Sequence, residues 1–454
     1  MGCARCHDHK YDPFTQREYY GLFAYFNNVP ERGRGIKVGN SPPAIKAPTR
    51  DQQRQLAAID EQLAVAQAAY DALGDEVAAG EAEWAESFAP KEPVYWAPAD
   101  ALAVHVPLDG STEDLCSEEP AALNDAAAFA PGALGQAAEF DGQSLAEIGD
   151  RADFGFFDAF TISAWILPRG DQGTIVARMA DVVRYGGSSV ELGAGTLQGY
   201  FSNRWLDVAL RVETREPLEA NRWHHIAVVY DGSRLATGVH IYVDGQERQI
   251  DVLLDGLNQS FQTKEPLRIG GGGRSRNFDG LIDDVRIYET DLPAGEIGVL
   301  ATRDSIGAIA ALSAEERTPG QAAGLRDYYL THHAPPHVQP ARARVRAIQK
   351  RRAEFEDDLP TTMVMVEMPT PRQTHVLKLG QYNLPRGRVT PDVPSALHQL
   401  PRGAATNRLG FAHWLVDPAN PLTARVAVNR FWQSYFGTGL VKTVDDFGAQ
   451  GEVP

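Results

Sequence analysis

The sequence predicts a multidomain α plus all-β protein, in which helical segments with a long helical hairpin bracket an antiparallel β-sandwich of the jelly-roll type. Three observations predict this fold class. Short alternating strands separated by Gly, Asn and Asp turns recur between residues 101 and 300, without long helices. Residues 50–88 carry apolar side chains at alternating steps of three and four, which is typical of a long amphipathic helix. A length of 454 residues is enough for roughly two to four domains.

The all-β region is marked by alternating apolar runs that end at turn residues. The clearest turn is Asp244-Gly245, because this dipeptide between two apolar runs is a strong hairpin signal. The predicted strands lie at residues 160–166, 225–230, 239–243, 267–269 and 281–288.

The long helix predicted over residues 50–88 has a second, distant helix as its expected partner. Residues 341–358 carry apolar side chains at compatible spacing and are basic, whereas the first helix is acidic. Opposite charges beside an apolar seam favour antiparallel packing, which brings the two ends of an inserted sandwich together. An anionic-ligand patch is the alternative for the basic run. The seam of the first helix consists of Leu56, Ile59, Leu63, Ala66, Tyr70, Leu73 and Val77.

Six segments follow from these patterns. They are 1–46, the end of a helical domain with a cysteine motif; 47–99, a coiled-coil-like helix and linker; 100–302, the sandwich; 303–358, a helical return; 359–405, an extended Pro-rich linker; and 406–454, the start of a second helical domain. Two helices are expected in the last segment, at 406–416 and 421–436. Asn420 is the expected cap of the second helix, Pro421 its first residue, and Gly437 its stop.

Net charge and the distribution of apolar residues argue against two classes of protein, those that bind nucleic acid and those that span a membrane. A net charge of −17 argues against a nucleic-acid-binding surface, which needs an excess of Lys and Arg. The sequence has no window of 18 uninterrupted apolar residues, so no membrane span is expected. Both ends look cut, and we expect a fragment whose signal peptide was lost with a missing N-terminus.

The first residues carry a motif with chemistry. Cys3-Ala4-Arg5-Cys6-His7 is C-x-x-C-H, the spacing at which Cys3 and Cys6 form thioether bonds to haem c and His7 becomes the axial iron ligand. Two alternatives stay open. One is a zinc site formed with His9 as a fourth ligand, and the other is a redox cysteine pair without a cofactor.

Both ends of the chain resemble one family. The residues around the motif, 3–13, resemble the end of the first conserved domain of the planctomycete c-type cytochrome family. Residues 407–416, 420–433 and 436–441 are similar to the start of its second conserved domain. The resemblance implies an exported protein, periplasmic or at the cell surface, and it supplies no established activity that could be carried over to the conserved domains.

The middle of the chain resembles another family, the laminin-G-like, concanavalin A-like jelly rolls. The segments that carry this resemblance are 140–142, 160–165, 223–228, 242–245 and 278–288. It implies a recognition domain whose ligand is a polysaccharide or a surface protein.

Within the sandwich, the residues favour binding over hydrolysis, since no pair of carboxylates suited to glycoside cleavage is apparent. Hard oxygen ligands offer two interpretations, a calcium site or solvated turn aspartates, and the calcium candidates are Asp109, Asp141, Asp279 and Asp284. For most of them the solvated turn is favoured. Asp283 and Asp284 are expected on opposite faces of their strand. The candidate aromatics for sugar binding are Tyr185, Tyr200, Phe201 and Trp205, each expected in the core rather than at a platform.

The sequence therefore predicts an exported, c-type haem-associated protein with a laminin-G-like recognition domain and an electron-transfer or redox-linked role. Its redox partner is not indicated, and no catalytic residue is singled out. One alternative is a structural or adhesive cell-surface protein without a redox role. The other is a carbohydrate-active or metal-dependent hydrolase.

Overall fold

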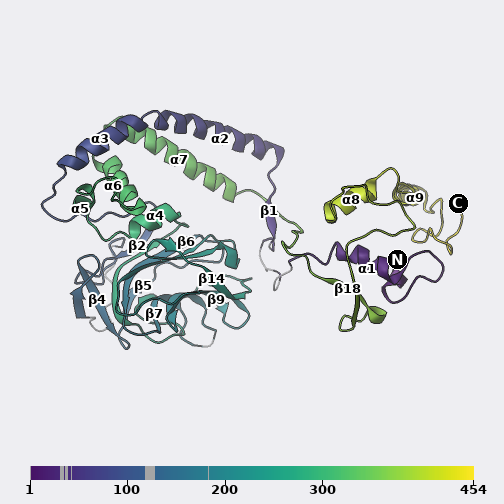
Figure 1. Cartoon of the computed structure of the whole chain (residues 1–454), viewed down its shortest axis with the longest axis horizontal. Helices are drawn as coiled ribbons and strands as arrows, with labels where there is room; N and C mark the ends of the chain where they lie inside the picture. Colours follow the sequence, from purple (N-terminus) through teal and green to yellow (C-terminus); the bar gives the residue numbers. More distant parts are fainter. Residues whose placement is uncertain (1, 31–34, 36–38, 42, 118–127, 183) are drawn as a thin grey trace. The chain divides into compact units, whose positions relative to one another are not determined.

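The chain folds into two compact units. The structure, a computed structural model, describes residues 2–30, 35, 39–41, 43–117, 128–182 and 184–454. Unit 1 combines Met1–Glu31 with Val364–Pro454, and unit 2 is Arg32–Met363 (Figure 1). Unit 2 is thus inserted into the sequence of unit 1. Among the described residues, no helix is long and apolar enough to cross a membrane.

Unit 2 contains the predicted β-sandwich, and all pairings between its named strands are antiparallel. In the described residues, one sheet has seven strands in the order β14-β10-β9-β8-β7-β15-β5, and the other has eight, in the order β13-β12-β11-β6-β16-β4-β3 with β2 also paired to β16. The multidomain α plus antiparallel sandwich fold is confirmed. The seven strands are β5 (Ala146–Gly149), β7 (Gly173–Met179), β8 (Gly187–Gly193), β9 (Thr196–Arg204), β10 (Val208–Thr214), β14 (Ile250–Asp255) and β15 (Leu267–Ile269). The eight are β2 (Leu102–Val106), β3 (Ala128–Pro131), β4 (Gln136–Asp141), β6 (Phe160–Pro168), β11 (His224–Tyr230), β12 (Val239–Val243), β13 (Gln246–Glu247) and β16 (Asp279–Tyr288).

Strand alternation divides the seven-stranded sheet into a core face and an outer face. In β8 and β9, Val190, Leu192, Leu197 and Phe201 enter the shared core of the two sheets. The side chains between them point outward, because successive residues of a strand face opposite sides. Burying each large apolar side chain stabilises the fold by roughly 1.5–3 kcal/mol.

The outer faces of the two sheets are covered differently. Helix α4 (Ala294–Leu300) lies on the eight-stranded sheet, where Ile297 and Leu300 pack with Ala227 and Tyr242 (Figure 1). The outer face of the seven-stranded sheet carries a small cluster of its own, formed by Ala177, Met179 and Tyr200 with Tyr185 and Trp205 packed against them.

The predicted turn at Asp244-Gly245 joins β12 to β13. Both residues have positive φ, 52° and 76°, as a two-residue turn of type I′ requires. The ends of the sandwich also meet, because Leu102 in β2 is the register partner of Tyr288 in β16. A guest domain with adjacent ends is easily inserted into another chain segment.

The long helical hairpin is present, but its first arm is not one helix. The sequence predicted a single helix over 50–88, whereas the structure has α2 (Arg50–Asp71) and α3 (Gly74–Ser87). The break falls at Leu73, whose ψ of 0° is not helical and precedes Gly74, a weak helix former.

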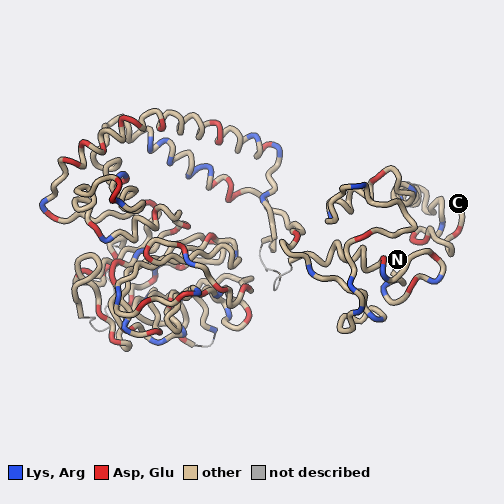
Figure 2. Tube along the Cα trace, viewed as in Figure 1, with Lys and Arg blue, Asp and Glu red and all other residues tan. Residues whose placement is uncertain are grey.

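The second arm is α7 (Val338–Asp357), which packs antiparallel to α2. Ile59 of α2 packs with Val345 and Ile348 of α7. Arg352 lies 2.6 Å from Asp60, while His337, the residue directly before α7, lies 3.0 Å from Glu76 in α3. The charges follow the predicted acidic and basic pattern (Figure 2). Helices α5 (Ile306–Ala310) and α6 (Pro319–His332) connect this hairpin to the sandwich.

The boundaries of the two compact units fall inside two of the six predicted segments, 1–46 and 359–405. Within these segments, β1 (Ala44–Lys46) pairs with β17 (Thr361–Met363) in a two-stranded sheet. Both strands belong to unit 2, whose boundaries are residues 31/32 and 363/364.

Unit 1 joins the two ends of the chain. The Ser395 backbone N–H donates to the Glu18 carboxylate at 2.9 Å, and the rings of Tyr25 and Phe411 stack with centres 5.0 Å apart. Its elements are η1 (Gly2–Arg5), α1 (Gln16–Ala24), β18 (Thr374–Leu377), η3 (Lys378–Gly380), β19 (Pro385–Val389), α8 (Arg408–Val416) and α9 (Thr423–Phe436).

The predicted signals around α9 are partly right. Gly437 ends the helix with a φ of 80°, as expected. The N-cap is Leu422 rather than Asn420, so Pro421 precedes the helix instead of opening it. Asn420 still accepts from the backbone N–H groups of Leu422 and Thr423, which makes it the turn residue before the helix.

Candidate functional site

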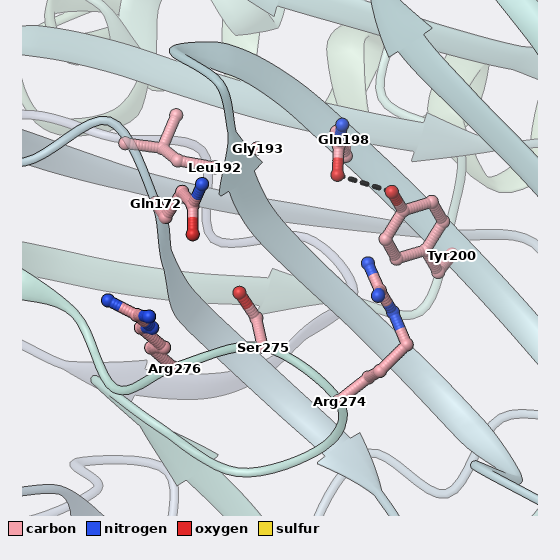
Figure 3. A pocket seen from close by; sticks show the side chains of 8 residues that line it. All are labelled: Gln172, Leu192, Gly193, Gln198, Tyr200, Arg274, Ser275 and Arg276. Carbon is pink, nitrogen blue, oxygen red and sulfur yellow. Dashed lines mark hydrogen bonds between the residues drawn. The ribbon is translucent and has the colours of Figure 1, made fainter.

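A pocket of about 390 Å³ opens on the outer face of the seven-stranded sheet (Figure 3). Strands β8 and β9 form its floor, and the loop between β15 and β16 forms one side. Its polar lining can both donate and accept hydrogen bonds. The lining residues are Gln172, Leu192, Gly193, Gln198, Tyr200, Arg274, Ser275 and Arg276.

Gln198 occupies the centre of a cross-strand row. Its register partners are Glu191 on β8 and Glu213 on β10, so the three side chains share the outer face. The Gln198 Nε2 donates to Glu213 Oε2 at 2.8 Å, and the Tyr200 hydroxyl donates to Gln198 Oε1. These bonds fix which way the amide points.

Next to this row, Trp205 is contacted by two guanidinium groups. Arg274 lies 4.4 Å and Arg211 lies 4.6 Å from the centre of the Trp205 ring. Tyr200 meets the same ring edge-on, with centres 4.8 Å apart. A guanidinium over an indole face is a favourable cation–π contact, so the ring orients both arginines.

Glu191 is a buried acid beneath Arg274. Its side chain is 1% exposed, and neither carboxyl oxygen has a partner of good hydrogen-bond geometry among the described residues. Burial raises the pKa of Glu191 to about 7, and Arg274 at 3.8 Å and the nearby Ser275 hydroxyl offset this only in part.

The predicted aromatic candidates separate in the structure. Phe201 belongs to the core between the sheets, as expected. Tyr200 is 2% exposed but lies on the outer face, where Tyr185 and Trp205 pack against it. The sequence analysis missed Glu191, Gln198 and Arg274, because their grouping depends on strand register and on a loop distant in sequence.

The four calcium candidates are only partly brought together. Asp141 and Asp279 are register partners where β4 and β16 meet. The Asp109 carboxylate instead accepts from the Gln136 backbone N–H at 2.6 Å. Asp284 lies 2.9 Å from both Arg286 and His105. Within the described ranges, no group of three or more His, Cys, Asp or Glu is arranged to hold a metal ion.

The expectation that Asp283 and Asp284 face opposite ways is wrong. Asp283 accepts from the Leu134 backbone N–H, and Asp284 contacts Arg286, so both avoid the core. The register shifts between Asp283 and Arg286, and Asp284 has a φ of 48°, which together form a bulge that breaks the alternation. Burial raises the pKa of Asp283 to about 7. Burial acts in the same direction on Asp284, but hydrogen bonds from His105 and Arg286 lower its pKa to about 2.

The cysteine motif lies at the surface of unit 1. Cys3 and Cys6 are free, exposed thiols on one turn, in which the Cys6 N–H donates to the Cys3 carbonyl at 3.2 Å. His7 Nδ1 lies 2.7 Å from the Asp8 carbonyl oxygen. Because a carbonyl only accepts, Nδ1 carries the proton and Nε2 keeps a free lone pair. This donor set fits haem c.

The fourth residue proposed for zinc is engaged locally. His9 Nδ1 accepts from the Asp12 backbone N–H at 2.9 Å. Cys3, Cys6, His7 and His9 do not form a group arranged to hold a metal in the described chain.

Comparison with protein families identifies the middle of the chain. Residues 140–298 match the concanavalin A-like lectin/glucanases superfamily. The inserted domain is a concanavalin A-like jelly roll. Residues 1–31 match a family described as protein of unknown function (DUF1549), and residues 407–454 match another (DUF1553). Both of these segments lie in unit 1, so the jelly roll and its helical hairpin interrupt one compact unit.

Solved structures similar to the chain include three single domains of larger proteins. The binding domain of Paraclostridial Mosquitocidal Protein 1 has a TM-score of 0.37 and 17% identity, over 44% of this chain and 52% of that one. Domain 4 of AbnA, an arabinanase from Geobacillus stearothermophilus in complex with arabinotriose, has a TM-score of 0.33 and 20% identity, over 46% and 100%. The binding domain of Botulinum neurotoxin DC, in complex with rat synaptotagmin II, has a TM-score of 0.32 and 12% identity, over 44% and 51%. The chain thus spans about half the length of the two toxin domains. No curated protein matches the chain.

Proposed function

We propose that the jelly roll is a carbohydrate-recognition module and that its ligand binds in the pocket on the seven-stranded sheet. The observation that carries this proposal is the pocket itself, which lies on the sheet face that α4 leaves uncovered and presents oriented polar groups beside an aromatic cluster. The match to a superfamily named for lectins and glucanases supports binding of a saccharide.

The lining suits a saccharide chemically. Sugar hydroxyls both donate and accept, and the Gln172 amide, the Gln198 amide and the Ser275 hydroxyl offer both functions. Tyr200 and Trp205 pack together beside these groups, and the Trp205 ring orients Arg274 at the edge of the pocket. Protein sites for small ligands commonly combine apolar walls with a few fixed polar groups.

Hydrolysis has less support than binding. Glu191 and Glu213 are two carboxyl groups on one face, but Glu191 is closed off from solvent. A general acid must reach the glycosidic oxygen within hydrogen-bond distance, which a fully buried carboxyl does not do in this arrangement.

The test is retention of the full chain on immobilised polysaccharides. Ser275→Trp fills the pocket and is expected to abolish retention, whereas Thr237→Trp, exposed on the 3-10 turn η2 (Ala236–Gly238), is the matched control and is expected to leave it unchanged. Equal retention of both variants, or no retention of the unmodified chain on any polysaccharide, contradicts the proposal.

A second function concerns unit 1. We infer that Cys3, Cys6 and His7 would hold haem c, the two cysteines through thioether bonds and His7 as a ligand of the iron, which would make the chain part of an exported redox-associated protein. The free Nε2 of His7 and the exposure of both thiols on one turn support this inference. When bound, the haem supplies one-electron transfer. The Asp8 carbonyl then holds His7 in the tautomer that presents Nε2.

Export stays part of the proposal. The family that both ends of the chain resemble implies a periplasmic or cell-surface setting. A recognition module in that setting anchors a redox segment to a polysaccharide or a surface protein. The electron donor and acceptor are not indicated by the described residues.

A further inference from the structure

Arginines in the pocket lack the close acidic partners that other arginines of the jelly roll have. Arg169, Arg204 and Arg268 hold direct ion pairs with carboxylates at 2.6–2.8 Å. Among the described residues, no ion pair is formed by Arg211 or Arg276, and Arg274 has only the buried Glu191 at 3.8 Å.

We propose that the ligand of this pocket is an anionic saccharide, whose carboxylate or sulfate group is bound by Arg274 and Arg276. This inference rests on the proposed recognition function and specifies the chemistry of its ligand. Guanidinium groups bind planar carboxylates and sulfates through pairs of N–H donors, so two arginines beside one pocket favour a negatively charged group.

The arrangement is fixed before a ligand arrives. The Gly273 backbone N–H and Arg268 both donate to the Asp181 carboxylate, at 2.7 and 2.8 Å, and these bonds anchor the loop that carries Arg274 and Arg276. On its other side Arg274 lies on the Trp205 ring. Figure 3 shows Arg274, Ser275 and Arg276 on one loop, across from Gln198 and Tyr200. A fixed donor group loses little conformational entropy on binding.

Glu191 makes this anion site sensitive to pH. Burial raises its pKa to about 7, so at and below neutral pH a large part of the Glu191 population is uncharged and does not compete for Arg274. Around it lie Gln198 and Tyr200 from β9, Arg274 and Ser275 from the loop, and Glu213 beyond Gln198. Burial also raises the pKa of Tyr200, so its hydroxyl stays protonated near neutral pH. Ionisation of Glu191 adds a negative charge beside Arg274 and weakens binding of an anion.

The test measures affinity of the full chain for three polysaccharides: polygalacturonate with carboxylates, dextran sulfate with sulfates, and neutral dextran. We expect one of the two anionic polymers to bind and neutral dextran not to bind. The double variant Arg274→Ala/Arg276→Ala is expected to lower the affinity by roughly tenfold or more. Arg222→Ala removes an exposed, ion-paired arginine elsewhere and is expected to keep the affinity.

The pH dependence of the affinity is tested with the variant Glu191→Gln. Affinity of the unmodified chain is expected to fall between about pH 6 and about pH 8, and the variant is expected to lose this dependence. Binding of a neutral polysaccharide that Ser275→Trp blocks, with no effect of the arginine variant, overturns the anionic ligand and leaves the recognition function standing. An equal loss with Arg222→Ala shows non-specific charge attraction and also overturns it. Failure of all polysaccharides to bind overturns both proposals.

Discussion

The guanidinium group of Arg274 lies 4.4 Å from the centre of the Trp205 ring. The two residues come from different parts of the chain, one in the loop after β15 and the other between β9 and β10. The contact holds a cationic side chain, 41% exposed, at the edge of the pocket. Under the proposed recognition function, Trp205 is therefore a positioning residue, which acts on a ligand through Arg274.

This role predicts non-additive effects on ligand affinity. Trp205→Ala is expected to weaken binding of an anionic polysaccharide several-fold, and to have almost no further effect when Arg274 is already alanine. The double-mutant cycle, measured by titration calorimetry, isolates this coupling. Tyr95→Ala, an exposed aromatic outside the sandwich, is the control. Additive losses contradict a positioning role.

The helical hairpin predicts a contrast between two apolar residues. Ile348 lies in the seam between α2 and α7 and is 8% exposed. Ile348→Ala is expected to lower the free energy of unfolding by roughly 2–4 kcal/mol. Val65 on α2 is 62% exposed, and Val65→Ala is expected to change the free energy by less than about 0.5 kcal/mol. Urea unfolding followed by circular dichroism measures both. Similar losses at the two positions contradict the packing described for the hairpin.

Stability is predicted to fall as pH rises from about 4.5 to about 7. Over this range folded Glu191 retains a proton that the unfolded chain releases, because burial raises the pKa of Glu191 from 4.5 to about 7. Asp283 contributes in the same direction, whereas the low pKa of Asp284 acts only at more acidic pH. The Glu191 contribution is on the order of 3 kcal/mol at most.

Urea midpoints across this pH range, compared between the unmodified chain and Glu191→Gln, check the pH prediction. The variant is expected to have the flatter profile. Glu289→Gln, at an exposed carboxyl group, serves as the control and is expected to follow the unmodified chain. Identical slopes in all three proteins contradict the account of Glu191.

The cysteine motif predicts covalent haem. Protein matured in a host with haem-attachment machinery is expected to keep its haem after denaturation and to give a pyridine haemochrome spectrum, which Cys3→Ala/Cys6→Ala abolishes. Cys116→Ala, which removes the third cysteine, is the control and is expected to keep the spectrum. Stoichiometric zinc without haem in such protein contradicts the inference.

Local sequence signals predicted much of this fold, and long-range contacts account for most of what they missed. Asp244-Gly245 and Gly437 adopt positive φ as their chemistry requires, and such turns are decided by a few neighbouring residues. The bulge at Asp284 was missed, because it depends on the pairing of β16 with a strand far away in sequence. The break at Leu73 was missed although Gly74, a weak helix former, follows it directly.

The candidate site was less predictable than the fold. Glu191, Gln198 and Glu213 form one row only through the register of three strands, which no spacing within a single strand reveals. Tyr200 and Trp205 were recognisable as aromatics, but Arg274 reaches them through a loop that begins 65 or more residues later in the chain. The Cys3, Cys6 and His7 motif was recognisable because all its residues are neighbours in sequence.

Hydrogen exchange of the full chain, with and without a bound polysaccharide, tests the central claim most directly. If the jelly roll recognises its ligand in the pocket on the seven-stranded sheet, the ligand is expected to slow exchange in peptides that cover β8, β9 and residues 270–278. Peptides of β12 and β13, on the other sheet, are expected to exchange unchanged. Protection confined to other segments, with none at β8, β9 and this loop, would show that the ligand binds elsewhere and would contradict the account.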